Sequence, residues 1–258
     1  MHELPKYEGE KFENGSINKV NDYLTIEEAL QVNINQIPFT VIMRSPGFED
    51  DMVRGLLHNE DVYKGNTKLE LRGVLKNKLG YITEVNVDIK KENLGRGYLN
   101  SRSLLSVSSC GICGKRELGD LTVKGSKLKG YDISPEMISV LLEKMRNEQM
   151  GFLQSGGSHA AAAFDENGEM LMVREDIGRH NAVDKVIGGL LNNNNLNKAK
   201  FIAVSGRISY EIVTKTFMAK ISVLLAVSAP SSLSVDFAKE LGVTIFGFCR
   251  AKKATRYS

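Results

Sequence analysis

The chain has 258 residues, of which 42% are hydrophobic and 25% charged, and its formal net charge at pH 7 is only +3. A chain of this length can bury a sizeable core as one large domain or two small ones. The near balance of charge gives no argument for a nucleic-acid partner, so an anion site must come from a local cluster.

The amino terminus and the cysteine count bear on where the protein works. Residues 1–18 are polar and contain no apolar core, which argues against a signal peptide or an anchor, and no later apolar run is long enough to span a bilayer. Three cysteines, an odd number, argue against a disulfide scaffold. We therefore expect a cytoplasmic protein with no membrane partner.

The first quarter of the chain predicts a polar lead-in followed by a strand and a helix. We expect residues 1–36 to be the lead-in, with at most a short strand, and residues 38–44 to be the first firm strand because their apolar side chains alternate. Asp50 and Asp51 are typical of the first turn of a helix, where the helix dipole favours acids. His58 ends this helix, and we interpret it as a solvated residue rather than a catalytic one.

Two further strands precede the most distinctive stretch. Residues 69–74 and 81–89 predict an antiparallel pair joined by a short polar turn. A polar stretch then leads to Cys110-Gly-Ile-Cys113-Gly, which is followed at once by Lys115. Two thiols at this spacing can form a redox couple, bind a metal or carry sulfur as a persulfide, and each use needs a thiolate.

The surroundings of the two cysteines favour a reactive loop over a buried pair. Lys115 and Arg116 supply positive charge that stabilises a thiolate. Gly111 and Gly114 leave the backbone free for tight turns and keep bulk away from the sulfur atoms. We therefore expect an accessible, mobile loop that a second molecule can reach.

The chain after the cysteines begins with a capped helix and a hairpin. Ser134 and Pro135 are typical of an N-cap and a first helical residue. Asn167-Gly168 between two short apolar runs is a strong signal for a hairpin. The turn before it, residues 155–159, gathers backbone amides, two hydroxyls and an imidazole, which suits an anion, although a plain structural turn is an equal alternative.

The densest polar stretch runs from Arg174 to Lys185, at the start of a predicted helix. A solvated helix start seldom gathers so many different donors and acceptors, so we interpret the stretch as part of a site. We expect His180 to be an orienting group rather than a general base, because the positive end of the helix dipole keeps its ring neutral. Asp176 and Asp184 are expected to hold the neighbouring cations in place.

The last third of the chain alternates apolar strands with amphipathic helices, which is typical of a largely parallel sheet covered on both faces. In such sheets ligands bind beyond the carboxyl ends of the strands. The three strand ends are Ser205-Gly-Arg207, Ser228-Ala-Pro230 and Phe248-Cys-Arg250, with Lys252, Lys253 and Arg256 close behind. Their cations predict a rim that suits phosphates, and a basic tail that only aids solubility is the alternative.

In their order along the chain, these motifs resemble the FdhD family of formate dehydrogenase accessory sulfurtransferases. The resemblance extends from about Phe39 to the carboxyl terminus, and the stretch from Arg174 to Lys185 is its most specific part. It also rests on the cysteine pair, the glycine-rich turn and the strand ends. Two departures, Ser155 where the family usually has threonine and Asp61 where glycine is common, touch neither cysteine.

The resemblance implies a fold, a reaction and a set of partners. The fold is a three-layer α/β domain similar to cytidine deaminase, preceded by a smaller mixed α+β part, in a homodimer that binds guanine nucleotide. Members take sulfur as a persulfide from a cysteine desulfurase and pass it to the molybdenum bis(molybdopterin guanine dinucleotide) cofactor that formate dehydrogenase needs. This cofactor is an acceptor rather than a tightly bound group. The zinc signature of deaminases is missing, so no metal is expected.

The resemblance also assigns roles to residues of this chain. Cys110 is implied as the main persulfide carrier, with Cys113 sharing or relaying the sulfur. The residues implied to bind the cofactor are Gly156, Gly157, His159, His180, Ser205, Gly206, Arg207, Phe248, Cys249, Arg250, Ala251, Lys252 and Lys253. The chain then divides into a lead-in at residues 1–36, an α+β part at 37–130 that ends in the cysteine loop, and an α/β cofactor-binding domain at 131–258.

From the residues alone, two other classes of protein stay open. A dithiol oxidoreductase of the thioredoxin type also uses Cys-Gly-x-Cys, but there the motif follows an early strand and opens a helix, whereas here it lies mid-chain among glycines and charges. The second class is a zinc-binding chaperone module. Two cysteines supply only half of a tetrahedral site, and Cys249 with a histidine must complete it from afar. Metal analysis of the purified protein separates these classes.

Overall fold

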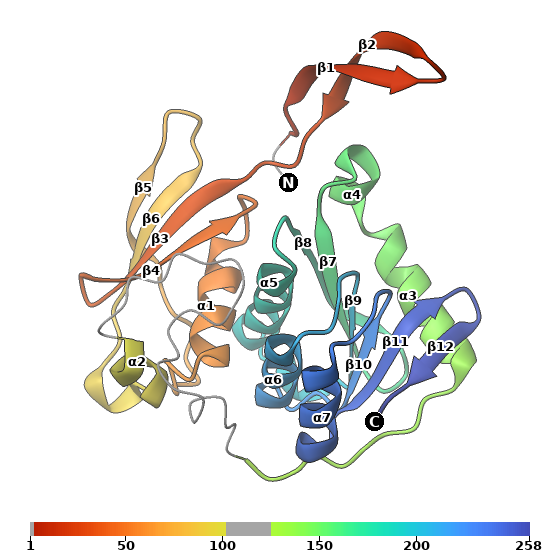
Figure 1. The fold of residues 1–258 in the computed structure, drawn as a ribbon. Coiled ribbons are helices and arrows are strands. Elements are labelled where there is room, and N and C mark those ends of the chain that lie inside the picture. Colours follow the sequence, from red (N-terminus) through yellow and green to blue (C-terminus); the bar gives the residue numbers. More distant parts are fainter. Residues whose placement is uncertain (1–2, 102–124) are drawn as a thin grey trace.

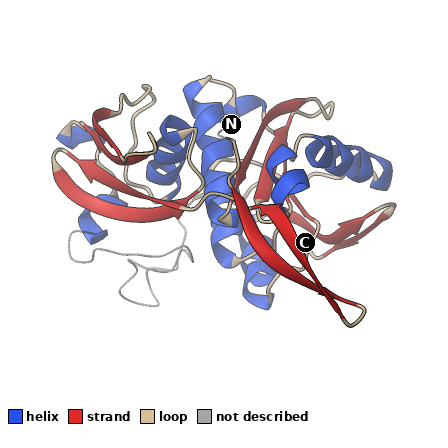
Figure 2. Ribbon diagram, turned by 90° about the horizontal axis from the view of Figure 1, so that it is seen from above, coloured by secondary structure: helices blue, strands red, loops and turns tan. Residues whose placement is uncertain are grey.

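The computed structural model describes residues 3–101 and 125–258. Two sheets lie on either side of a layer of helices (Figures 1 and 2). The amino-terminal sheet has four strands in the order β4-β3-β6-β5, and the carboxyl-terminal sheet has six in the order β12-β11-β10-β9-β7-β8. The predicted mixture of a smaller α+β part and an α/β domain is confirmed, while the likeness to cytidine deaminase stays a prediction.

The four-stranded sheet buries its own core against one helix. Its strands are β3 (Glu28–Ile34), β4 (Ile37–Arg44), β5 (Arg72–Lys76) and β6 (Ile82–Val87), and its helix is α1 (Glu49–Asn59). Strand β5 pairs antiparallel with β6, as predicted. Met52, Val53 and Leu57 of α1 are fully buried against this sheet. The predicted acidic first turn of α1 is confirmed by Asp50 and Asp51.

The prediction of a polar lead-in over residues 1–36 is wrong. Strand β3 lies inside the sheet, antiparallel to β4 and parallel to β6. Its Leu30 and Val32 are fully buried. The predicted boundary at residue 36 falls in the turn between β3 and β4, where Asn35 and Gln36 both take left-handed backbone with φ of 52° and 68°. The signal for this strand was present, since Leu30, Val32 and Ile34 alternate with Gln31 and Asn33, but it is short and follows a long polar stretch.

The first part of the presumed lead-in is a regular hairpin. Strands β1 (Lys6–Glu13) and β2 (Ser16–Tyr23) pair antiparallel along their whole length. The turn between them is Asn14-Gly15, with φ of 51° and 77°, which is the pairing that a tight hairpin turn favours. This hairpin projects away from both sheets (Figure 1).

The six-stranded sheet is mixed rather than largely parallel. Its strands are β7 (His159–Phe164), β8 (Met170–Asp176), β9 (Phe201–Val204), β10 (Val223–Ala226), β11 (Thr244–Arg250) and β12 (Lys253–Arg256). Only β9, β10 and β11 run parallel to one another. Strands β7, β8 and β12 join by antiparallel pairing, because the predicted Asn167-Gly168 hairpin and the turn after Arg250 both reverse the chain.

Helices cover both faces of this sheet, as predicted, and make three layers. The main helices are α3 (Pro135–Asn147), α4 (Met150–Ser155), α5 (Arg179–Asn192), α6 (Tyr210–Met218) and α7 (Ser232–Leu241), and the short ones are η1 (Lys91–Asn93), α2 (Arg96–Ser101) and η3 (Leu196–Lys198). Helices α5, α6 and α7 bury one face and α3 buries the other. Ser134 caps α3 by accepting a hydrogen bond from Met137 N at 3.2 Å. No helix within the described ranges is long and apolar enough to cross a membrane.

Two glycines let the sheets share one helical layer. Helices α1 and α5 pack directly against each other between the sheets (Figure 1). A methyl group at Gly55 would overlap the backbone oxygen of Asp184, and one at Gly188 would overlap that of Asp51. The close approach therefore needs a residue without a side chain on each helix.

Candidate functional site

The predicted cysteine loop, with Cys110 and Cys113, lies outside the described residues. The third cysteine, Cys249 on β11, is 1% exposed. Burial raises the pKa of its thiol to about 11, so it is protonated at neutral pH. Cys249 therefore packs in the core, and its sulfur does not reach the surface where a cofactor was expected to meet it.

The predicted rim forms at the ends of β9, β10 and β11. Ile208 N, after β9, donates to Ala229 O at 3.1 Å, and Phe248 N donates to Ser228 O at 3.1 Å. The start of β7 joins the same edge, because β7 runs antiparallel to β9 and Ser205 N donates to Ala160 O at 3.0 Å. Residues far apart in sequence thus line one edge of the sheet.

His159 and Ser205 meet at this edge. Ser205 Oγ accepts from Ala160 N at 3.0 Å and lies 3.3 Å from His159 Nδ1. Burial, and then the positive charge of Arg179, lowers the pKa of His159, which keeps its ring neutral. A Cβ on Gly206 would lie 3.2 Å from the Arg179 side chain and 3.4 Å from His159 Nδ1. The glycine therefore keeps this corner open.

A half-open pocket lies beside this corner. Its volume is about 150 Å³. Its lining comes from both units of the molecule, the amino-terminal unit with the four-stranded sheet and the carboxyl-terminal unit with the six-stranded sheet. The lining residues are Glu27, Met43, His159, Ile177, Gly178 and Arg179. Glu27 precedes β3, and Met43 is in β4. Gly178 is the residue before α5, and Arg179 opens that helix. The site therefore exists only when the amino-terminal sheet is docked against the α/β part.

The cations of the rim are available to a ligand. Arg207, Arg250, Lys252 and Lys253 are all exposed, and none of them makes an ion pair with a carboxylate of the described residues. Phe248, which is 48% exposed, and Ala251 take left-handed backbone with φ of 54° and 48°. Such a backbone is uncommon for residues with side chains and is often found where a loop contacts a ligand.

The glycine-rich turn is mostly structural. Gly156 ends α4 with φ of 66°. The hydroxyl of Ser155 lies 2.7 Å from Thr25 Oγ1, and that of Ser158 donates to Glu175 Oε1 at 2.7 Å. The two hydroxyls expected to hold an anion are therefore engaged within the protein. Gly157 packs against Thr25, and only His159 of this turn reaches the pocket.

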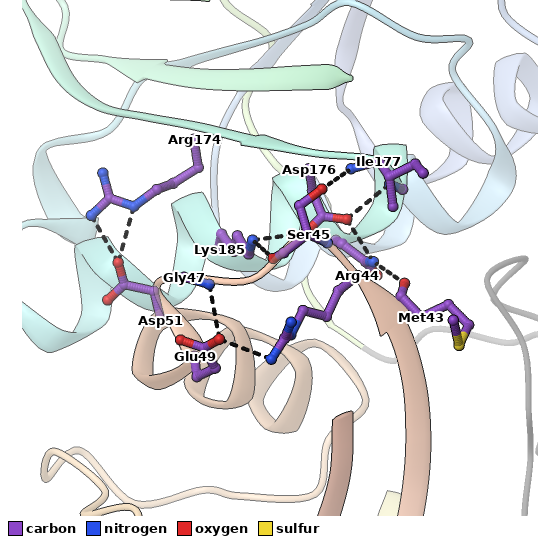
Figure 3. A network of polar contacts seen from close by, with 12 residues as sticks. Met43, Arg44, Ser45, Gly47, Glu49, Asp51, Arg174, Asp176, Ile177 and Lys185 are labelled. Carbon is purple, nitrogen blue, oxygen red and sulfur yellow. Dashed lines mark hydrogen bonds and ion pairs between the residues drawn. The ribbon is translucent and has the colours of Figure 1, made fainter. Parts of the chain in front are cut away.

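The stretch from Arg174 to Lys185 joins the two units (Figure 3). Lys185 Nζ lies 2.7 Å from Asp176 Oδ2 and donates to Ser45 O at 2.8 Å. Asp176 also accepts from Ser45 N at 3.1 Å. Arg174 pairs with Asp51 of α1 at 2.8 Å. The prediction that Asp176 holds a neighbouring cation is confirmed, but the Lys185–Asp176 pair is buried and the Arg174–Asp51 pair half-buried, so the network joins the two units and does not form a ligand surface.

His180 and Asp184 belong to the interior as well. His180 is 5% exposed, and its Nε2 lies 3.0 Å from Ser209 Oγ, so its side chain does not line the pocket. Asp184 receives Lys215 Nζ at 2.6 Å instead of a cation from its own stretch. His58 is only partly exposed rather than fully solvated as predicted, since its Nε2 lies 3.3 Å from Met218 O and burial lowers its pKa.

A metal site needs a cluster of histidine, cysteine or acidic side chains. Within residues 3–101 and 125–258, no group of three or more histidine, cysteine or acidic side chains is placed to hold a metal ion. Cys110 and Cys113, on which the zinc alternative depends, lie outside those ranges.

Sequence reasoning missed Glu27 and Met43 as parts of the site. No local motif marks either residue, and Glu27 was assigned to the lead-in. The signal that would have found them is the strand at residues 28–34, whose pairing with β4 brings both residues to the pocket.

The fold and this edge define a mixed α/β protein with a cationic rim and a neutral imidazole at its strand ends. Comparison with known proteins is more specific: the chain belongs to the FdhD/NarQ family, which matches residues 25–258. It is 34% identical to the sulfur carrier protein FdhD of Sulfolobus acidocaldarius over 99% of this chain and 97% of the relative. It is 38% identical to that of Saccharolobus solfataricus over 93% and 90%.

A solved structure agrees in fold. A protein from Desulfotalea psychrophila, described as a candidate formate dehydrogenase accessory protein, superposes with a TM-score of 0.75 at 20% identity. The match covers 99% of this chain and 96% of that chain. At this identity the likeness shows the fold alone.

Proposed function

We propose that the protein accepts sulfur as a persulfide on the Cys110–Cys113 loop from a cysteine desulfurase and delivers it to the molybdenum bis(molybdopterin guanine dinucleotide) cofactor of formate dehydrogenase. The observation that carries this proposal is the rim of exposed cations, including Arg207 and Arg250, beside an open pocket. A dinucleotide acceptor carries phosphates, which guanidinium groups bind in a bidentate way. Relatives named sulfur carrier proteins support the sulfur chemistry.

The loading step needs no external oxidant. The Cys110 thiolate attacks the terminal sulfur of the desulfurase persulfide, and the bond between the two sulfurs of the donor breaks. The donor cysteine leaves as a thiolate, and Cys110 now carries the extra sulfur. One sulfur–sulfur bond is exchanged for another, so the step is a transfer without net redox change. Cys249 does not compete, because its buried thiol stays protonated.

The test is mass spectrometry of the intact protein after incubation with a cysteine desulfurase and cysteine. The wild type is expected to gain the mass of sulfur, and Cys110→Ala is expected to lose that gain and the activation of formate dehydrogenase. Cys249→Ala is the matched control, since it removes a cysteine that burial keeps unreactive. Full loading and activation by Cys110→Ala would contradict the proposal, and a mass loss of two hydrogens without sulfur would favour a dithiol oxidoreductase.

We propose further that the protein works in the cytoplasm as a homodimer. Light scattering of the purified full chain measures its molecular mass in solution, and a monomer at all concentrations would contradict the dimer.

A further inference from the structure

The hairpin of β1 and β2 exposes apolar side chains and both of its edges. Phe12 is 72% exposed, and Tyr7 and Ile17 are exposed as well. The two strands form a sheet by themselves, so no third strand of residues 3–101 and 125–258 pairs with an outer edge. An isolated hairpin is marginally stable in water, and an uncovered edge is a template for pairing with another chain. The hairpin therefore suits contact with a further strand.

Helix α4 presents a second apolar surface, which lies outside the core. Its exposed apolar side chains are Met150, Phe152 and Leu153, and Gly151 is its buried residue. The orientation of the helix is fixed by Glu175 of β8, whose carboxylate accepts from Gly151 N at 2.7 Å and from Phe152 N at 2.8 Å. Hydrogen bonds thus hold these apolar side chains in water, and exposed groups of apolar side chains mark interaction sites.

The hairpin begins beside α4 and ends far from it. At its base, Thr25 Oγ1 lies 2.7 Å from Ser155 Oγ of α4, and the neighbouring Leu24 is exposed. Each strand has eight residues, so the tip at Asn14-Gly15 is about 25 Å from the base. The hairpin also projects from the body of the molecule (Figure 1). The apolar side chains near the tip therefore do not cover α4 of their own chain.

A second copy of the chain can supply the missing strand. Two identical strands that meet edge to edge and antiparallel are related by a two-fold axis normal to the sheet, which passes beside one residue of each strand. For β2, an axis at Val20 leaves no like charges opposite each other. The facing pairs are Val20 with Val20, Lys19 with Asn21, Asn18 with Asp22, and Ile17 with Tyr23. The last pair sets a β-branched against an aromatic side chain, which stabilises antiparallel strands.

The other registers that pair nearly a whole strand set like charges opposite each other. An axis at Lys19 of β2 puts Lys19 against itself. On β1, an axis at Gly9 puts Glu8 against Glu10, and an axis at Glu10 puts Glu10 against itself. Like charges directly opposite each other destabilise a pair of strands. Charge complementarity therefore selects β2 and the axis at Val20.

The same register brings the apolar tip of one hairpin to α4 of the second copy. Because the strands run in opposite directions, Ser16 next to the tip faces Leu24 at the base of the other hairpin. The tip then lies beside Thr25 of that copy, which contacts α4. The two-fold axis repeats the contact, so one interface covers two apolar tips and two apolar helices.

We propose that two copies of the chain associate through the outer edges of their β2 strands, about an axis at Val20, with the tip of each hairpin against α4 of the other copy. The inference rests on the homodimer in the proposed function and adds the surface through which it forms. The hairpin precedes residues 25–258, which the family match covers, so this surface does not follow from membership of the family.

Cross-linking tests the register, in a chain that carries Cys110→Ser and Cys113→Ser. Val20→Cys places two thiols opposite each other, where facing Cβ atoms are about 4.5–5.5 Å apart, so mild oxidation with diamide is expected to convert most of the protein to a covalent dimer. Gly9→Cys is the matched control, because Gly9 pairs with Val20 at the same level of the hairpin but lies on β1. Three strand spacings, about 14 Å, separate the two Gly9 positions in the dimer, which is beyond the reach of a disulfide. Gly9→Cys is therefore expected to stay free of cross-links.

Light scattering of the full chain tests the charge argument. Val20→Lys sets two ammonium groups opposite each other and is expected to weaken dimerisation roughly tenfold or more. Leu153→Ser removes an exposed apolar side chain from α4 and is expected to weaken dimerisation as well. The control is Leu79→Lys, which changes a side chain that is 76% exposed in the turn between β5 and β6, and it is expected to leave the dimer intact. Circular dichroism shows whether each variant is folded.

The outcomes separate this inference from the proposed function. If the wild type is dimeric but Val20→Cys cross-links no more than Gly9→Cys, or if Val20→Lys dimerises as the wild type does, this interface is overturned while the homodimer stands. If Val20→Lys stays dimeric and instead loses the activation of formate dehydrogenase, the edge of β2 binds a client and the inference is wrong. If the wild type is a monomer at all concentrations, the inference and the homodimer both fall, while persulfide loading at Cys110 still tests the sulfur transfer.

Discussion

The buried pair of Lys185 and Asp176 offers a quantitative test of the joint between the two units. The side chains are 1% and 0% exposed, and Lys185 Nζ lies 2.7 Å from the Asp176 carboxylate. Lys185→Met keeps a long apolar stem but removes the charge. Asp176 is then left without its cation, and Ser45 O loses a donor at 2.8 Å.

The size of the loss in unfolding free energy depends on the hydrogen bonds that Asp176 keeps in the variant. Removing one partner of a buried ion pair costs about 3–5 kcal/mol, because the remaining charge is uncompensated. Asp176 still accepts from Ser45 N at 3.1 Å, Gly178 N at 2.8 Å and Asn181 Nδ2 at 2.9 Å. These bonds stabilise the lone carboxylate, so we expect a loss near the lower limit, about 3 kcal/mol. For a chain of this size the melting temperature should fall by roughly 6–12 °C.

The assay is urea unfolding of the purified variants, with a surface pair as control. Arg256 and Asp132 lie 2.8 Å apart, but their side chains are 50% and 90% exposed. Arg256→Met is therefore expected to cost no more than about 1 kcal/mol. The double variant Asp176→Asn/Lys185→Met should recover part of the loss, since it removes both charges. If Lys185→Met loses no more stability than Arg256→Met, the reasoning about the joint is refuted.

Three further predictions concern the rim, the half-buried His58 and the contact between α1 and α5. Replacing Arg207 or Arg250 with alanine should weaken binding of guanosine diphosphate by about 1.5–3 kcal/mol, the scale of a hydrogen bond to a charged group. Unchanged affinity of both variants in calorimetry would show that the phosphates do not bind at this rim. Burial, and then the charge of Arg54, lowers the pKa of His58, so the folded state favours the neutral ring. The contribution of His58 to the free energy of unfolding is therefore complete above the ordinary pKa of 6.5 and is lost as the pH falls below it. His58→Gln should therefore flatten the decline in unfolding free energy below about pH 6.5, and an unchanged slope in urea titrations would count against this. Gly55→Ala drives a methyl group into the backbone of α5 and should lower the free energy of unfolding by about 1–3 kcal/mol or more. In the control Gly9→Ala the new methyl group meets only Val20 at 3.8 Å, so the loss should be far smaller. Equal melting temperatures of the two variants would show that the helices are not in close contact.

Strongly periodic elements were predictable because their signals are local. Helix α3 has its cap at Ser134, and the β7–β8 hairpin has its Asn167-Gly168 turn. The hairpin at Asn14-Gly15 carried the same kind of signal, but its strands have no apolar alternation because both faces are exposed. Strand β3 did carry the alternating pattern, in Leu30, Val32 and Ile34, but over too few residues to stand out from the polar stretch before it.

The roles of individual residues were less predictable than the location of the site. The stretch from Arg174 to Lys185 was rightly singled out as dense in polar groups, yet most of those groups face Ser45, Asp51 and the rest of the amino-terminal unit. A sequence pattern shows that charges are present but not which of them find partners. Arg179 is set apart only by the packing of α5 against its surroundings, which pairs its neighbours and leaves it facing the pocket.

The sequence by itself determined the family, the alternation of strands and helices after residue 130, and the gathering of Ser205, Arg207 and Arg250 at strand ends. These follow from short-range patterns, because backbone periodicity, caps and turns depend on neighbouring residues. Only the tertiary structure decided that the sheet is mixed, that two glycines bring α1 against α5, and that Glu27 shares a pocket with Arg179. The last two features arise from contacts between residues more than a hundred positions apart, and the mixed sheet depends on the antiparallel pairing of β7 with β9, which β8 and α5 separate in the sequence. No local pattern encodes these contacts.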